Sequence, residues 1–193
     1  MRPIPVFSAL IQRFSRFFPA VPAASRAFLT PTTATPRQWL LDDARLTDWH
    51  NWRRAFLANP QPWALATPEL ASSIMDWAWL WQDQPLLDAL EHVLEQKPAD
   101  SPAWQAQRSR LQRPSAWLLV AGPQARQWQQ RLMPVLQALP EALTLFVMPQ
   151  PVARAAPERL DWREDTAAVL CRGLECSSPI RDLDYLLETL QDG

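Results

Sequence analysis

The chain has 193 residues, which suits one large domain or two small ones, and 48% of them are hydrophobic, so a sizeable core can form. The formal net charge is −1, which gives no reason to expect nucleic acid or another polyanion as a partner. Two cysteines are too few for a disulfide scaffold, and with 3 glycines and Pro123 directly after Gly122 the sequence lacks the glycine-rich loop that holds a nucleotide phosphate.

Residues 1–36 read as a basic leader, made of an amphipathic helix and a linker rich in Pro, Ala and Thr. Residues 1–41 carry five arginines and no acid, which leaves a net charge of −6 on the rest of the chain. The apolar residues of the predicted helix fall mainly on one face: Ile4, Phe7, Leu10, Ile11, Phe14, Phe17 and Phe18.

Three interpretations of this leader stay open. The helix could pack on the protein's own body, lie at a membrane surface through residues 4–18, or belong to a transit-type peptide or disordered leader. Arg13 and Arg16 interrupt any signal-peptide core, and no apolar run approaches the roughly 20 residues of a membrane span. We therefore expect a cytoplasmic protein, with membrane-surface contact as one option.

The middle region, residues 37–96, is predicted to be helical. A helical tendency starts at Arg37, and Thr47 or Asp48 is a suitable N-cap for a helix that continues to Leu57. After a break at residues 59–62, Thr67 and Pro68 form a second helix start.

That second helix should run from Pro68 to about Gln82. Because its second half is apolar nearly all round, it should be buried on more than one side. The segment Asp83-Gln84-Pro85 leads into a third helix that ends near Gln96, and the two helices should form a hairpin.

The last region, residues 97–193, changes to strand periodicity after a linker at 97–102 and a short helix at 103–112. Three apolar runs are typical of buried strands, at 115–121, 143–148 and 167–171, with helices at 124–139 and 181–190. Pro134 should kink or divide the first of these helices. Since strand–helix–strand units are right-handed crossovers, the first two strands should be parallel neighbours. The predicted fold is a helical N-terminal and middle region followed by a small, mainly parallel three-stranded α/β layer.

Two stretches resemble a known family. Asp42-Asp43-Ala44-Arg45-Leu46-Thr47-Asp48-Trp49 is similar to the Asp-Asp-Lys-x-Leu-Thr-x-Trp segment of spermatogenesis-associated-type thioredoxin-domain proteins, and Val169–Asp182 is similar to their closing strand with its Cys-x4-Cys, Pro and Asp pattern. Those proteins join a thioredoxin domain to an (α/α) six-hairpin barrel. Weaker likeness covers Trp117–Gly122 and the helix around Met75–Leu80 with the turn after it. The resemblance assigns the family pattern to Asp42, Asp43, Thr47, Trp49, Pro179 and Asp182.

The departures from this family define what the resemblance implies. Ala44 replaces the family's Lys, His50-Asn51 replaces its Asn-Gly, and the thioredoxin Cys-x-x-Cys does not occur in the chain. The interval from Trp49 to Trp117 is too short for the helices that the barrel has there. The resemblance therefore implies a shortened relative without the family's active site, that is, a non-catalytic structural or interaction protein with an unidentified protein partner.

Cys171 and Cys176 are the first chemical candidates. Five positions apart, they could reach disulfide distance if the turn at Gly173 folds back. They are either a redox pair, which would make the chain a thiol-redox accessory protein, or two reduced, half-buried structural thiols. Cys176 is the more reactive candidate because it precedes a helix start, with Arg172 and Arg181 near in sequence.

The tryptophans allow two hypotheses as well. Trp49, Trp77 and Trp81, with neighbours such as Trp52, Trp63 and Trp79, could form stacking platforms of a carbohydrate-binding module, or they could fill the core. Trp77 and Trp81 share a helix face, while Trp79 points across from it.

The remaining candidates are ionisable. Asp42, Asp43, Asp48 and His50 could serve as a general acid and base or could simply form a solvated helix start. His50 and His92 are distant from the two cysteines in sequence, so we expect neither a metal site nor a cofactor.

Overall fold

A computed structural model describes residues 36–61, 65, 67–113, 116–139, 143–149, 165–173 and 175–191. The predicted leader helix at residues 4–18 and nearly all of its linker lie outside the described residues. The described elements, in chain order, are β1 (Gln38–Leu40), α2 (Asp43–Ala58), α3 (Pro68–Leu80), α4 (Gln84–Glu95), α5 (Pro102–Gln112), β2 (Trp117–Ala121), α6 (Ala125–Ala138), β3 (Thr144–Met148), β4 (Ala167–Arg172), β5 (Glu175–Cys176) and α7 (Leu183–Gln191).

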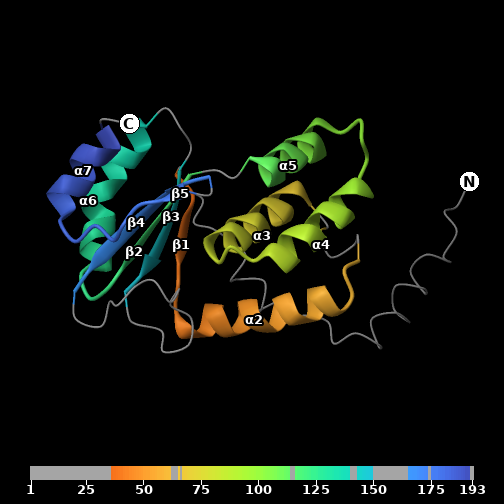
Figure 1. Ribbon diagram of the computed structural model, residues 1–193, viewed down its shortest axis with the longest axis horizontal. Helices are drawn as coiled ribbons and strands as arrows, with labels where there is room; N and C mark the ends of the chain where they lie inside the picture. The colour runs from red at the N-terminus through yellow and green to blue at the C-terminus, as the bar shows by residue number, and fades with distance from the viewer. Residues whose placement is uncertain are drawn as a thin grey trace, which may run out of the picture.

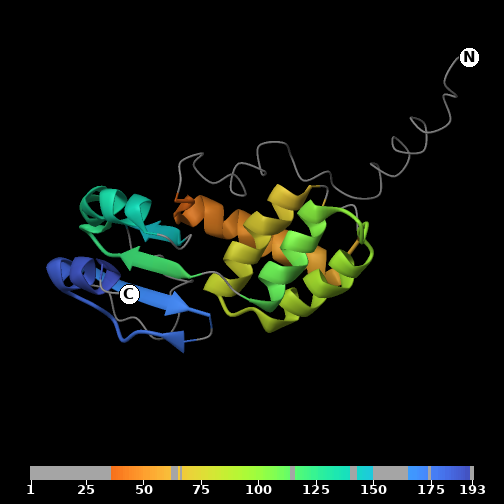
Figure 2. The same ribbon diagram turned by 90° about the horizontal axis from the view of Figure 1, so that it is seen from above.

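These elements form three layers, with the sheet between two groups of helices (Figure 1). Helices α2 to α5 cover one side of the sheet, and α6 and α7 cover the other, as Figure 2 shows from above. The apolar residues of β2 divide accordingly: Trp117, Leu119 and Ala121 join the core with α2 to α5, whereas Leu118 and Val120 join the core with α6 and α7. All five residues of β2 are buried, as its continuous apolar run predicts.

The sheet has five strands in the order β1-β3-β2-β4-β5 and is mixed. The predicted parallel pairing of β2 with β3 through the α6 crossover is confirmed. The prediction of a mainly parallel three-stranded layer is wrong. Strand β4 pairs antiparallel with both of its neighbours, β2 and β5, and β1 adds a further parallel strand beside β3. The chain enters β4 beside the end of β2, with Ala167 opposite Ala121, and therefore runs back along it.

Strand β1 also corrects the expected helix start. The helix does not begin near Thr47 but at Asp43, where Asp42 is the N-cap and its carboxylate accepts the N–H of Arg45 at 2.8 Å. Thr47 lies inside α2 and donates its hydroxyl to the Asp43 carbonyl at 2.8 Å. Because β1 pairs with β3, the sheet draws strands from both the middle and the last region of the chain.

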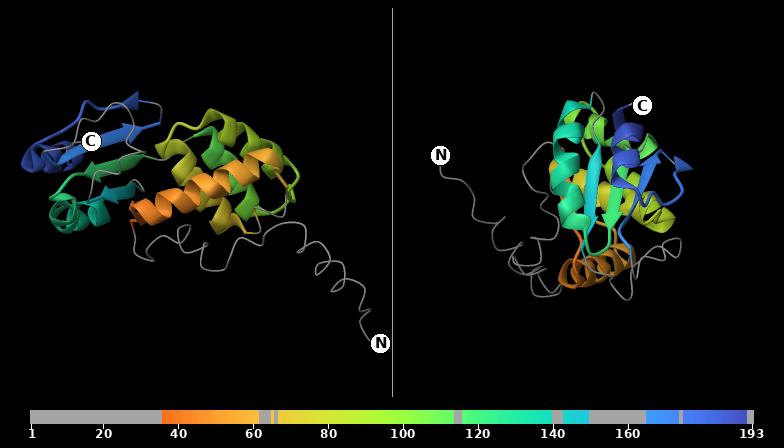
Figure 3. Two further views of the ribbon diagram at one scale, coloured as in Figure 1. Left: turned by 90° about the horizontal axis from the view of Figure 1, so that it is seen from below. Right: turned by 90° about the vertical axis from the view of Figure 1, so that its left-hand side faces the viewer.

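The hairpin of α3 and α4 follows the prediction closely. Thr67 caps α3 by accepting the N–H of Leu70 at 3.2 Å, and Pro68 occupies the first turn. Residues 71–78 are all buried, since α3 packs between other elements. Figure 3 shows the helical layer and the sheet from two further sides. The connection from α3 to α4 passes through Gln82, whose φ is +49°.

Helix α6 runs unbroken through Pro134, so the predicted division of this helix is wrong. Proline removes a backbone hydrogen bond and crowds the preceding turn, and Pro134 is exposed. We expect Pro134→Ala to raise the free energy of unfolding by about 1–2 kcal/mol, after allowance for the more flexible unfolded chain. Urea denaturation measures this change, and an unchanged or lower midpoint would show that α6 tolerates the proline without cost.

Candidate functional site

The two cysteines meet across the β4–β5 hairpin. Cys171 lies directly opposite Cys176 in the antiparallel register, and Gly173 makes the turn with φ +64°. Their Cα atoms are 4.0 Å apart and their sulfurs form a disulfide, so the pair is not held as two reduced thiols. Direct opposition across an antiparallel pair brings the two cysteines within reach of a disulfide.

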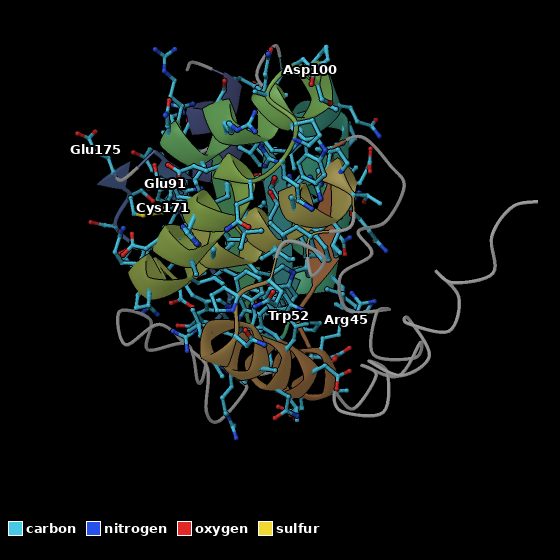
Figure 4. The ribbon with its side chains drawn as sticks, turned by 90° about the vertical axis from the view of Figure 1, so that its right-hand side faces the viewer. Arg45, Trp52, Glu91, Asp100, Cys171 and Glu175 are labelled. Carbon is cyan, nitrogen blue, oxygen red and sulfur yellow. A yellow bond between two sulfur atoms is a disulfide. The ribbon has the colours of Figure 1, made fainter. Side chains whose placement is uncertain are left out.

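The disulfide spans two environments. Cys171 is fully buried in the core between the sheet and helices α2 to α5, whereas Cys176 is half-buried at the margin of that core. The Gln82 side-chain amide, in the α3–α4 connection, donates to Cys176 Sγ at 3.9 Å. Cys171 and Glu175 lie on the side of the molecule where the hairpin meets the helical layer, away from Trp52 and Arg45 (Figure 4).

This arrangement favours attack on Cys176 by an outside thiolate, because its sulfur is the more accessible one. The leaving sulfur is then Cys171, and its apolar surroundings disfavour a thiolate. Arg181, expected near Cys176, pairs instead with Asp165 at 3.2 Å. Exchange at this bond should therefore be slow compared with that of a catalytic disulfide.

The candidate stacking residues Trp49 and Trp77 belong to the core. Trp49 is 1% exposed and Trp77 is 0% exposed. Trp49 stacks on Trp77 with ring centroids 5.1 Å apart and on Trp52 at 5.5 Å, while Trp77 meets Trp39 edge to face at 5.7 Å. Neither ring therefore offers a face to a sugar.

Trp81, the third stacking candidate, is half-buried at the edge of the same core, and Trp63 lies outside the described residues. Trp52 and Trp79 are half-buried as well and pack against this core, where Trp52 stacks on Phe56 at 5.0 Å. The hypothesis of a carbohydrate-binding module has no support from the position of these rings.

A network around Asp76 escaped the sequence reasoning. Its carboxylate, 2% exposed, accepts from Arg110 Nη2 at 2.7 Å and from Trp39 Nε1 at 3.1 Å, and forms an ion pair with Arg37 Nη2 at 3.2 Å. These partners come from β1, from the residue before it and from α5, so the carboxylate on α3 ties three elements together. One signal was present in the sequence: an acid inside an apolar helix must be paired to be buried.

Two serines complete this network. The Ser72 hydroxyl accepts from both Arg37 and Arg110, and Ser73 accepts from Arg37 Nη2 at 2.9 Å. Burial lowers the pKa of Arg37, with Arg110 acting in the same direction and Asp76 opposing it. Arginine keeps its charge at any ordinary pH, so the network is a fixed tie and not a titrating site.

The described residues that carry the sequence resemblance mostly have structural roles. Asp42 caps α2, Thr47 bonds within it, and Trp49 fills the core. Asp182 caps the start of α7, where its carboxylate accepts the N–H groups of Asp184 at 2.8 Å and Tyr185 at 3.1 Å. Two further members of the pattern, Asp43 in the first turn of α2 and Pro179 just before the bridge at Ile180, are exposed.

The acidic cluster near His50 does not assemble as an acid–base pair. Asp42 is occupied as a helix cap, and the carboxylate whose charge raises the pKa of His50 is that of Asp83. Asp83 forms a two-point ion pair with Arg53, in which Arg53 Nη2 donates at 2.6 Å, and it also caps α4. Partial burial lowers the pKa of His50, Arg53 and Arg54 lower it further, and Asp83 opposes them.

This lowered pKa predicts a pH dependence. The folded chain holds the His50 proton less tightly than the unfolded chain, so stability is unaffected above the usual histidine pKa and falls as the pH drops through and below it. We expect the wild type to lose more stability than His50→Gln between about pH 7.5 and about pH 5.5. Parallel urea titrations test this, and equal losses in both proteins would contradict it.

A small cavity of about 300 Å³ lies at the end of β2, beside the start of α6. Its lining is Pro123, Gln124, Trp128, Asp165, Thr166 and Arg181. Ligands often bind where a strand ends before a helix. Here Thr166 Oγ1 accepts the Gln124 N–H at 2.8 Å, so the protein itself already uses this N–H group, which a ligand in the cavity would otherwise bind.

Within the described ranges, no group of three or more His, Cys, Asp or Glu residues is arranged to hold a metal ion. In the same part of the chain, no helix combines the length and the apolar character that crossing a membrane requires.

No protein-family model, no curated protein and no solved structure matches the chain.

Proposed function

We propose that this chain is a non-catalytic interaction protein and a shortened relative of the spermatogenesis-associated-type thioredoxin-domain proteins that its sequence resembles. One observation carries the proposal: the described members of the family pattern with clear side-chain roles act as helix caps and core residues, not as a reaction centre. Asp42 and Asp182 cap helices, and Trp49 is buried.

A chain that keeps the helix caps and core residues of the resembled segments keeps what those segments contribute to folding. The sequence lacks the Cys-x-x-Cys of the thioredoxin domain, so the chemistry of that domain has no counterpart in it. The Asp76 network and the stacked tryptophans hold the helical layer on the sheet. We infer that this layered body binds a protein partner in the cytoplasm.

In-cell photo-cross-linking tests the interaction role. A photoreactive residue is placed in turn at Tyr185 on α7, Glu91 on α4 and Arg126 on α6, all exposed. We expect a discrete adduct of constant mass from at least one position, and its loss when Asp76→Ala is added to disturb the fold. Uncross-linked chain at all three positions would contradict the proposal.

Membrane-surface contact through residues 4–18 is a separate part of the proposal, motivated by the Phe-rich, arginine-bearing leader. Flotation with vesicles containing anionic lipid tests it. We expect the full chain to float and Arg13→Glu/Arg16→Glu to float less. If both proteins stay at the bottom of the gradient, the leader has no affinity for this surface.

A thiol-redox accessory role is the second candidate, favoured by the disulfide between Cys171 and Cys176. The burial of Cys171 argues against rapid turnover, as described above. The two functions predict opposite results in a turnover assay, which is described at the end of the Discussion.

A further inference from the structure

The short strand β5 is joined to β4 by the disulfide and by the pairing of two residues. β5 comprises Glu175 and Cys176, which face Arg172 and Cys171 in the register. At the turn, a side-chain carbon added to Gly173 would meet nothing within 4 Å, so the turn projects into open space.

Beyond β5 the backbone of the same segment bonds to β4 at two places, Ser177 next to the disulfide and Ile180 further along. The Ser177 N–H bonds to the Leu170 carbonyl at 2.8 Å, and Ile180 exchanges two backbone bonds of 2.8 Å with Ala168. Ile180 is buried in the core with α6 and α7. A change at the sulfurs should consequently act on the hairpin end and leave the segment from Ile180 onward in place.

On its inner side, the disulfide touches the helical layer. Gln82, at the α3–α4 connection, contacts Cys176 Sγ, and Cys171 is packed in the core that contains Trp77 and Trp81. The disulfide therefore links β5 to β4 at the place where the sheet contacts the α3–α4 connection. Release of β5 would uncover the outer edge of β4 at Arg172, whose backbone groups face Glu175 of β5 and would then be unpaired.

We propose that the Cys171–Cys176 bond is a redox clasp: a protein dithiol reductant opens it, and the hairpin end separates from β4 and from the α3–α4 connection while the rest of the fold stays intact. The clasp does not depend on the interaction role proposed above, and its test has a separate readout.

The redox step balances as ordinary thiol–disulfide exchange. A thiolate of the reductant attacks Cys176 Sγ, a mixed disulfide forms, and Cys171 leaves as a thiolate that takes up a proton. The second thiol of the reductant then attacks its own sulfur in the mixed disulfide, Cys176 leaves and is protonated, and the reductant departs as a disulfide. The chain gains two electrons and two protons, and the reductant loses them.

Hydrogen exchange on the full chain tests the clasp. The oxidised protein is compared with protein held in dithiothreitol, and the mass of each sample reports whether both thiols are free. On reduction we expect exchange at the Glu175 and Ser177 amides, which face β4 in this register, and at Gln82 and Asp83, to rise about tenfold or more. The Ile180 amide and the amides of β2 and β3 serve as internal references and should not change.

Two variants keep the test sharp. Cys176→Ser cannot form the bond, so it should exchange like the reduced wild type and ignore dithiothreitol. The control variant Ser178→Ala changes an exposed residue near Cys176 and keeps both cysteines, so it should respond to the reductant as fully as the wild type does. The proposal is overturned if the freed thiols leave exchange at Ser177 unchanged, if exchange rises throughout the fold, or if the folded protein resists the dithiol.

Discussion

Asp76→Ala should lower the free energy of unfolding by about 3 kcal/mol or more, which is a large part of the stability of a typical domain. The carboxylate is 2% exposed, accepts hydrogen bonds from Arg110 and the indole N–H of Trp39, and pairs with the charge of Arg37. Without it, two guanidinium groups face each other over Ser72, and a buried indole loses its acceptor. The arginines are 30% and 26% exposed and can partly turn to water, which places the expected loss at the lower end of the range for broken buried pairs.

Urea denaturation at neutral pH measures this loss. Asp88→Ala is the matched control, since Asp88 is an exposed acid on α4 whose partner is the exposed Gln84. Its effect should stay within about 0.5 kcal/mol. Similar small effects for Asp76 and Asp88 would mean that the network does not hold the layers together.

Gly122→Ala should cost about 3 kcal/mol or more. Gly122 follows β2 with φ +121°, a conformation that other residues rarely adopt. An added Cβ would lie 2.6 Å from Thr166 Cα and 2.8 Å from the Asp165 carbonyl oxygen. Both contacts are backbone atoms at the start of β4, so the change can be relieved only by moving that strand away from β2.

The second glycine of the sheet supplies the comparison. Gly173 also has a positive φ, +64°, but an added Cβ there meets nothing within 4 Å. Gly173→Ala therefore carries the conformational cost alone, about 1 kcal/mol. Unfolding free energies compare the two variants. We expect Gly122→Ala to lose more, both from crowding against Thr166 and because its φ lies outside the left-handed helical region, and equal losses would contradict this.

The elements that the sequence predicts well are those with strong local signals. The apolar runs of β2 and β3 and the Thr67-Pro68 helix start each specify their structure from adjacent residues. Strand β1 has only three residues, too few to show an alternation of apolar and polar side chains. It forms because its backbone pairs with the edge of β3. The antiparallel direction of β4 likewise depends on where the chain re-enters the sheet, which no local pattern encodes.

The candidate site divides in the same way. A turn glycine between two cysteines allows their approach, and the hairpin joins them. The tryptophans could not be assigned from spacing, because a stripe on a helix looks the same whether water or another element covers it. Trp39 of β1 and Trp49 of α2 provide that cover for Trp77, and both partners come from elements whose positions were not predictable.

A multiple-turnover assay of thiol–disulfide exchange tests the central claim most directly. The full chain is given a disulfide-bonded peptide substrate and excess glutathione, and substrate reduction is compared with that by the Cys176→Ser variant. Our account predicts no acceleration by either protein, because Cys171 would leave as a thiolate from an apolar site and the role that we propose for the chain is non-catalytic. Acceleration by the wild type that is lost in Cys176→Ser would contradict the account and would establish a thiol-redox function.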